Sequence, residues 1–244
     1  MTKELRILPL AGLPEIRAGD DLGALVAAAT QLEEGDIVVI AQKVVSKAEG
    51  RIIRLGDVEP SERARELATE DVDAQHIEAI LRESKRIVRT RPGFIIAETQ
   101  HGFVCASAGV DASNAPEEGT LVLLPVDPDG SARAIRARLK ELTGRTVAVI
   151  VSDSFGRPWR QGTTDVAIGV AGIGPLLDLR GRRDALGRKL QSTQIAVVDE
   201  LAGAAELVMG KTDGVPGAVI RGLEPQGDGS ARNLVMPAQR DLFP

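Results

Sequence analysis

The apolar run at residues 146–151, TVAVIV, is the strongest strand signal in the chain and constrains its fold more than any other feature. Residues 37–41 form a second run that is typical of a buried strand, and residues 5–10 form a third. Helical spacing of apolar residues predicts helices after Asp20 or Asp21, after Ser61, around residues 77–81, before Gly144, and between Asp199 and Gly210. This mixture of strands and helices indicates an α+β or mixed α/β fold.

The remaining segments are interpreted as short strands and turns. Residues 86–124 are expected to form several short strands, with residues 100–102 at a hairpin tip. The helix before Gly144 is expected to bury Ile135, Leu139 and Leu142. No repeat, low-complexity linker or clear boundary interrupts the chain, so residues 1–244 are treated as one domain.

Composition excludes several classes of protein. A net charge of −5 lacks the basic surface of a general nucleic-acid binder, and an aromatic content of 2% leaves no platform for stacking bases. The single cysteine, Cys105, excludes an internal disulfide framework, and two histidines make a histidine-based metal site improbable. Neither a signal peptide nor a membrane-spanning run is found, so a cytoplasmic protein without a membrane partner is expected.

Three polar, glycine-containing loops are predicted directly after apolar strands, where α/β proteins place their ligands. In the first, residues 107–114, the Asp111 carboxylate is a hard oxygen ligand suited to Mg²⁺ or Mn²⁺. Asn114 could bond a phosphate or a sugar. The same residues could instead satisfy their own backbone as a network of Asx turns.

The second loop, residues 153–162, follows the strongest strand. Asp153 stands at the end of that strand, and Ser154 could share a second metal. Arg157 and Arg160 suit carboxylate or phosphate groups because a guanidinium binds two oxygens at once. Trp159 could stack on a flat ring, or it could anchor an interface or a core.

The third loop, residues 42–50, offers Lys47 as a phosphate contact, although a solvated lysine is the simpler interpretation. Residues 209–214 join the set at the end of a predicted helix. A helix C-terminus carries negative partial charge, so phosphate there would need Lys211 or a metal. Two aspartates holding divalent ions, with lysine and arginine nearby, together describe a metal-assisted nucleotide or phosphoryl site.

Other polar residues are given structural interpretations. Asp199 is interpreted as a helix cap and Asp127 as a turn residue. The basic residues of segment 180–189 either form a solvated hairpin or receive an anionic substrate or a partner subunit.

Taken together, a set of motifs resembles the coenzyme F420:L-glutamate ligase family. The resemblance covers most of the chain, and the order and spacing of its motifs are specific although each one alone is weak. The motifs are residues 8–14 (LPLAGLP), 19–22 (GDDL), 45–51 (VSKAEGR), 108–114 (AGVDASN), 124–131 (LPVDPDGS), 153–157 (DSFGR) and 199–201 (DEL).

The resemblance implies a two-subdomain ligase fold that forms an intertwined homodimer, with GTP bound in a groove. It implies GTP-dependent addition of L-glutamate to the carboxylate of coenzyme F420-0, and then of γ-linked glutamates, through an acyl phosphate. It further implies Mg²⁺ or Mn²⁺, two per site, and K⁺.

Residue roles follow from the same resemblance. Asp111 and Asp153 match ligands of one metal and Ser154 a ligand of the second, while Asp153, Arg157 and Lys47 are the expected catalytic residues. The expected nucleotide contacts are Ala11, Gly12, Leu13, Pro14, Gln42, Lys43, Lys47, Asn114, Met209, Gly210, Lys211, Thr212, Asp213 and Gly214. Lys211 stands where family members place an acidic or amide metal ligand, and we hypothesise that its charge replaces that of a cation.

Two other functions remain open from the residues alone. The same metal and nucleotide site would serve a phosphotransferase acting on another small acid. It would also serve a non-catalytic module that binds a nucleotide or a deazaflavin.

Overall fold

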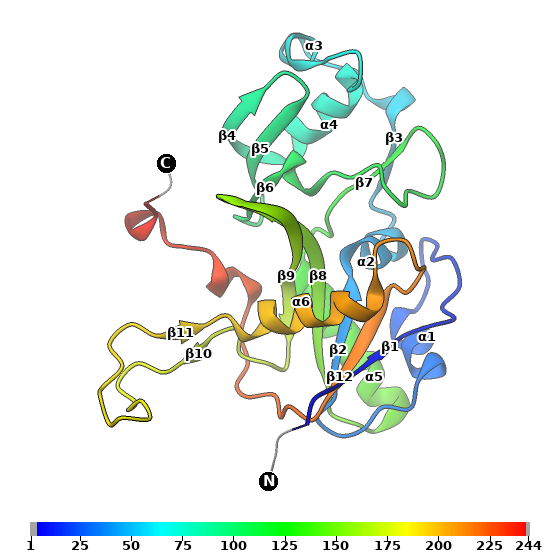
Figure 1. Ribbon diagram of the computed structural model, residues 1–244. Coiled ribbons are helices and arrows are strands. Elements are labelled where there is room, and N and C mark those ends of the chain that lie inside the picture. The colour runs from blue at the N-terminus through cyan, green and yellow to red at the C-terminus, as the bar shows by residue number, and fades with distance from the viewer. Residues whose placement is uncertain (1–3, 243–244) are drawn as a thin grey trace.

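A five-stranded sheet is the centre of the computed structural model, which describes residues 4–242 (Figure 1). The pairs at its two ends are antiparallel, and so is the pair that joins β12 to β2, whereas β2 and β8 run parallel. In order across the sheet, the strands are β1 (Arg6–Pro9), β12 (Gly217–Arg221), β2 (Ile37–Ala41), β8 (Ala148–Arg157) and β9 (Arg160–Ala171).

Three helices pack on this sheet. α6 (Val197–Met209) crosses the face turned toward the viewer in Figure 1 and contacts β1, β9 and β12. α1 (Leu22–Ala29) and α5 (Pro128–Thr143) pack against each other, and α5 also contacts β8 and β9. The mixed α/β fold expected from the sequence is confirmed.

Capping residues set the helix ends largely as predicted. The Asp21 carboxylate accepts a hydrogen bond from the Ala24 backbone N at 2.9 Å and starts α1. Asp127 starts α5 in the same way through the Gly130 backbone N at 3.0 Å, so this residue is a cap as well as part of a turn. Gly144 ends α5 with a left-handed φ of 71°, which glycine adopts without strain.

The two central strands are buried because both faces of the sheet are covered there. Ile37, Val38 and Val39 of β2, and Val149 and Ile150 of β8, are 0% exposed. Uniformly apolar strands of this kind are typical of parallel pairs with cover on both faces. In their register, Ile37 lies opposite Ala148 and Ala41 opposite Ser152, so β2 ends at one edge of the sheet and β8 continues beyond it to Arg157.

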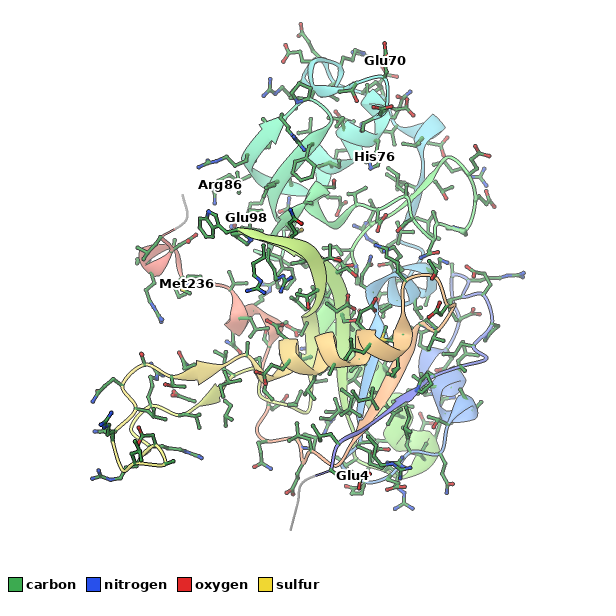
Figure 2. The ribbon with its side chains drawn as sticks, viewed as in Figure 1. Glu4, Glu70, His76, Arg86, Glu98 and Met236 are labelled. Atoms are coloured by element: carbon green, nitrogen blue, oxygen red, sulfur yellow. The ribbon has the colours of Figure 1, made fainter. Side chains whose placement is uncertain are left out.

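Residues between β2 and α5 form a second group of elements, at the top of Figure 1. Its hydrophobic residues form a cluster of their own, around Ile77, Ile95 and Leu121, separate from the cluster of the large sheet. On its surface Arg86 and Glu98, labelled in Figure 2, form an ion pair at 3.1 Å. The elements are α2 (Gln42–Ala48), which leads into the group, then β3 (Ile52–Arg54), η1 (Leu55–Asp57), α3 (Glu62–Leu67), α4 (Ala74–Glu83), β4 (Ser84–Arg91), β5 (Phe94–Thr99), β6 (Val104–Ala106), η2 (Ser107–Gly109) and β7 (Thr120–Val122).

The remaining elements are short. β10 (Leu177–Asp178) pairs with β11 (Gln194–Ile195) at the base of a long arm that extends from the body in Figure 1. η3 (Ala231–Leu234) and η4 (Ala238–Arg240) follow β12. No helix within residues 4–242 combines the length and the apolar character that crossing a membrane requires.

Two predicted loops are regular elements instead. Residues 42–50 contain helix α2, because Val44 and Val45 pack into the large core and Ser46 is also buried. Residues 153–157 continue β8 and residues 160–162 begin β9, so the predicted second loop is a hairpin end. Trp159, in its tight turn with φ of 56°, is 80% exposed and anchors no core of this chain.

Two smaller predictions are wrong. Leu142 is 44% exposed, because the buried face of α5 passes through Ile135 and Leu139 and turns away from the sheet in the last turn. Asp199 does not cap α6, whose cap position is Ala196. Its carboxylate instead accepts a hydrogen bond from the Ala167 backbone N of β9 at 2.9 Å.

Asp129 and Asp199 satisfy backbone N–H groups on the open edge of β9. Asp129, buried in the first turn of α5, accepts hydrogen bonds from the backbone N atoms of Val170 at 2.8 Å and Ala231 at 3.0 Å, and from the Ser230 hydroxyl. A strand edge left open would expose unpaired donors, so these carboxylates take the place of a sixth strand.

We therefore expect Asp129→Ala to lower the free energy of unfolding by about 3 kcal/mol, because two buried backbone donors lose their acceptor. Asp127→Ala, two residues earlier, removes an exposed cap and an exposed ion pair with Arg133, and should cost about 1 kcal/mol. Urea denaturation of both variants measures the difference. Equal losses would show that Asp129 does no more than cap the helix.

Candidate functional site

A cavity of about 290 Å³ lies at the edge of the sheet where β2 ends and β8 continues beyond it. Its walls come from segments that are distant in the sequence: residues 13–16, the start of α2, the strand pair β8–β9 and the end of α6. The polar residues that line it are Glu15, Gln42, Lys43, Lys47, Asn114, Ser152, Asp153, Ser154, Asp165, Glu206, Lys211 and Thr212.

A second cavity, of about 210 Å³, adjoins the first. Asp153, Ser154 and Lys211 line both, so these three residues stand where the two cavities meet. Its other wall comes from the smaller group of elements and includes Cys105 and Asp111. Burial, reinforced by the charge of Asp153, raises the pKa of the Cys105 thiol to about 12, so this cysteine is not a ready nucleophile.

An ion pair between Lys43 of α2 and Asp111 connects the large sheet with the smaller group of elements. The Lys43 ammonium lies 2.8 Å from the Asp111 carboxylate. Burial alone would raise the pKa of Asp111, but the hydrogen bond and charge of Lys43, together with the bonds from Ser113, hold it below the ordinary value. The Asx turn that the sequence suggested is present, and it leaves the carboxylate charged.

The pKa of Asp153 is shifted in the opposite direction to that of Asp111. Burial raises the pKa of the Asp153 carboxyl group to about 7, and repulsion by Asp165 and Asp111 adds to the shift, whereas the charge of Lys43 and the Ser154 backbone N–H oppose it. Lys43 therefore stabilises the charged form of both aspartates. The position of its ammonium marks a place where a cation is favoured.

The oxygen donors near this place fit a divalent ion. Two carboxylates and the Ser154 hydroxyl are hard ligands of the kind that Mg²⁺ and Mn²⁺ prefer. Within residues 4–242, no group of three or more His, Cys, Asp or Glu side chains is arranged to hold a metal. A cation here would complete its coordination with water or phosphate oxygens, as Mg²⁺ usually does at phosphoryl sites.

Other side chains of the first cavity are suited to an anion. The Lys47 side chain is 10% exposed, and its ammonium pairs with Glu15 at 2.5 Å. Gln42 is buried, and its side-chain oxygen accepts a bond from Ser46 at 2.9 Å, while its Nε2 has no partner among the described residues. A buried N–H group without an acceptor is costly, so Nε2 is a donor available to a bound oxygen.

The structure brings together most of the residues that the sequence singled out. Asp111, Asp153, Ser154, Lys43 and Lys47 all line one of the two cavities. So do the predicted nucleotide contacts Leu13, Pro14, Gln42, Asn114, Met209, Gly210, Lys211, Thr212 and Gly214.

Other predicted site residues lie apart. Arg157 lines neither cavity, and its guanidinium donates to the Gln161 carbonyl at the hairpin end. Ala11, Gly12 and Asp213 are also absent from both linings.

Four polar residues that line the first cavity were missed by sequence reasoning: Glu15, Ser152, Asp165 and Glu206. Asp165 is the one with a signal in the sequence, since it is a carboxylate next to an apolar run that is buried in the sheet. Burial and repulsion by Asp165 raise the pKa of Glu206, and Lys211 opposes the shift. The first cavity therefore carries excess negative charge on the side of α6.

The chain is similar to known proteins over most of its length. The family described as F420-0:Gamma-glutamyl ligase matches residues 12–222, a span that includes every residue lining the two cavities. Coenzyme F420:L-glutamate ligase of Methanopyrus kandleri is 50% identical over 246 residues, covering 98% of this chain and 97% of the relative. The enzyme of the same name from Methanothermobacter thermautotrophicus is 48% identical over 250 residues, covering 98% of each chain. That of Methanocaldococcus jannaschii is 44% identical over 249 residues, covering 100% and 99%.

The raised pKa of Asp153 predicts how stability changes with pH in the metal-free protein. The group titrates near 3.8 when unfolded and near 7 when folded, so the folded state binds more protons between these values. The stabilising contribution of the Asp153 carboxyl group to the free energy of unfolding is therefore lost as the pH rises from about 3.8 to about 7. We expect Asp153→Asn to be more stable than the wild type above pH 7 and to lose less stability over this pH range.

Urea denaturation at a series of pH values, with a chelator present, measures this effect. Asp111→Asn is the matched control, because the lowered pKa of Asp111 predicts a loss of stability at neutral pH instead. An Asp153→Asn profile parallel to that of the wild type would contradict the assignment.

Proposed function

The chain belongs to the F420-0:gamma-glutamyl ligase family and is a ligase, and from this premise we propose that it joins L-glutamate to the carboxylate of coenzyme F420-0 with GTP as co-substrate. Further glutamates would then be added through γ-linkages. One observation carries the proposal: the two cavities meet at Asp153, Ser154 and Lys211. A ligase needs such a meeting point, because the nucleotide and the acceptor must react with each other.

In the proposed reaction, GTP occupies the first cavity and the acceptor carboxylate enters from the second. A carboxylate oxygen attacks the γ-phosphorus, the bond from that phosphorus to the bridging oxygen breaks, and GDP leaves. The amine of L-glutamate then attacks the acyl carbon. Phosphate leaves with one of the original carboxylate oxygens, and the nitrogen gives up a proton as the amide forms.

The residues of the first cavity divide this work among them. Lys47 and the free Nε2 of Gln42 would bind phosphate oxygens, for which Lys47 exchanges its pairing with Glu15. Asp111, Asp153 and Ser154 would hold divalent cations, which would neutralise the charge that develops on the phosphate groups. Lys43 already pairs with Asp111 and helps to keep that carboxylate charged, whereas at Asp153 it only opposes the effect of burial, and a bound cation would complete the ionisation of Asp153.

Arg157 is the one predicted catalytic residue that we leave out of this scheme, because its contacts keep it at the hairpin end. K⁺ remains part of the proposal on the family resemblance. We also propose a two-subdomain chain that acts as an intertwined homodimer in the cytoplasm. The two separate hydrophobic clusters and the extended arm that carries the 78% exposed Leu186 support this proposal.

Mass spectrometry of coenzyme F420-0 after incubation with the protein, GTP, Mn²⁺, K⁺ and L-glutamate tests the function. We expect successive additions of glutamate, with repeated turnover of GTP to GDP only when both F420-0 and glutamate are present. Asp153→Ala should abolish the additions. Repeated GDP release without glutamate would contradict the ligase and identify a phosphotransferase, and no turnover would leave a binding module.

Lys211 provides a second test. It lines both cavities. Its charge opposes the effect of burial, which raises the pKa of the neighbouring Glu206. If Lys211 replaces a cation, Lys211→Gln should raise the Mn²⁺ concentration needed for half-maximal activity about tenfold, which corresponds to roughly 1.4 kcal/mol. A titration that coincides with that of the wild type would contradict the hypothesis.

A further inference from the structure

We propose that Asp165 is a positioning residue of this site. Its carboxylate accepts hydrogen bonds from the hydroxyl groups of Ser152 and Ser154, and the oxygen of Ser154 therefore presents only lone pairs to the cavity. The inference rests on the proposed function, since it concerns how Ser154 would serve as a ligand there. It concerns a residue for which the motifs of the sequence gave no role.

The pairing of β8 with β9 produces this arrangement. Asp165 lies directly opposite Ser154 in the register of the two strands. The Ser154 hydroxyl donates to Asp165 Oδ1 at 2.6 Å, and the Ser152 hydroxyl donates to Oδ2 at 3.0 Å. Each oxygen of the carboxylate thus takes one serine, which fixes the carboxylate in place. Ser152 and Asp165 are 1% and 5% exposed, so water does not compete for these bonds.

A serine hydroxyl has one proton and two lone pairs. Because the proton of Ser154 is directed to Asp165, its oxygen faces the cavity as an acceptor alone. An acceptor-only oxygen binds a cation and cannot donate to a phosphate oxygen. Ser154 lines both cavities, so the oriented oxygen stands at their meeting point.

The charge of Asp165 supports the same role. Among residues 4–242 it takes part in no ion pair, although a buried carboxylate is ordinarily paired with a cation. A buried carboxylate that receives only two serine hydroxyl groups would favour a cation beside Ser154.

A purely structural role would be to tie β8 to β9. That role would need only the hydrogen bonds, whereas a positioning role needs the orientation of the Ser154 oxygen. Direct measurement of Mn²⁺ binding separates the two, and it does not depend on ligase turnover.

The experiment is a Mn²⁺ titration of the full chain followed by electron paramagnetic resonance, with and without GDP. Asp165→Asn keeps the shape but removes the charge and replaces one acceptor oxygen by an NH₂ donor, so Ser152 and Ser154 can no longer both direct their protons to this residue. Loss of a group that orients a metal ligand typically weakens binding about 10–100-fold, and we expect a loss in this range. Thr163→Val, an exposed change on the same strand, is the control and should bind as the wild type does.

Ser154→Ala keeps the test decisive if Asp165→Asn folds poorly, because it should weaken Mn²⁺ binding by a similar factor. If Asp165 acts through Ser154, adding Asp165→Asn to Ser154→Ala should cause little further loss. The proposal is overturned if either single variant binds Mn²⁺ as tightly as the wild type, if their effects simply add, or if the wild type binds no Mn²⁺ with GDP present. Ligase activity measured separately distinguishes these failures from failure of the proposed function.

Discussion

The parallel pairing of β2 with β8 is the constraint on which the site depends. It places Ala41 opposite Ser152, so the chain leaves β2 at this edge of the sheet while β8 continues past it. α2 begins immediately after β2 and carries Gln42, Lys43 and Lys47 to that edge, while β8 continues into Asp153 and Ser154. The carboxyl ends of neighbouring parallel strands form ligand sites in many α/β proteins for this reason. A shift of one residue in this pairing would turn every side chain of one strand to the opposite face.

Opposed charges then determine what the edge can bind. Asp111 belongs to the smaller group of elements and Asp153 to the large sheet, and the Lys43 ammonium stabilises the charged form of both. Asp165 and Glu206 add negative charge on the side of α6, and Lys47 and Lys211 add positive charge on the side of the expected phosphates. Such an arrangement is preorganised for a cation bound together with an anion, which is the chemistry of a nucleotide with its metal.

Sequence reasoning identified the central strands and most helix ends, because each leaves a local signal, and it singled out many residues that line the first cavity, most of them through the motifs of the family resemblance. Residues 37–41 and 146–151 are uniformly apolar, and Gly144 and Gly210 end their helices as predicted. The secondary structure of segments 42–50 and 153–162 was not predictable from the sequence. Packing of Val44 and Val45 makes the first segment a helix, and pairing between strands makes the second a hairpin. Asp129 and Asp199 form hydrogen bonds with β9, and Asp165 forms hydrogen bonds with two serines. These bonds join residues that are distant in the sequence, so no periodic pattern in the sequence predicts them.

Transfer of labelled oxygen tests the central claim most directly, namely that a phosphoryl group passes to an acceptor carboxylate where the two cavities meet. Coenzyme F420-0 with ¹⁸O in the reacting carboxylate would be converted in ordinary water with GTP and L-glutamate, and the released phosphate examined by mass spectrometry. The account predicts one labelled oxygen in the phosphate for each amide formed. Unlabelled phosphate accompanying amide formation would show that the carboxylate never bonded to phosphorus, and would contradict it.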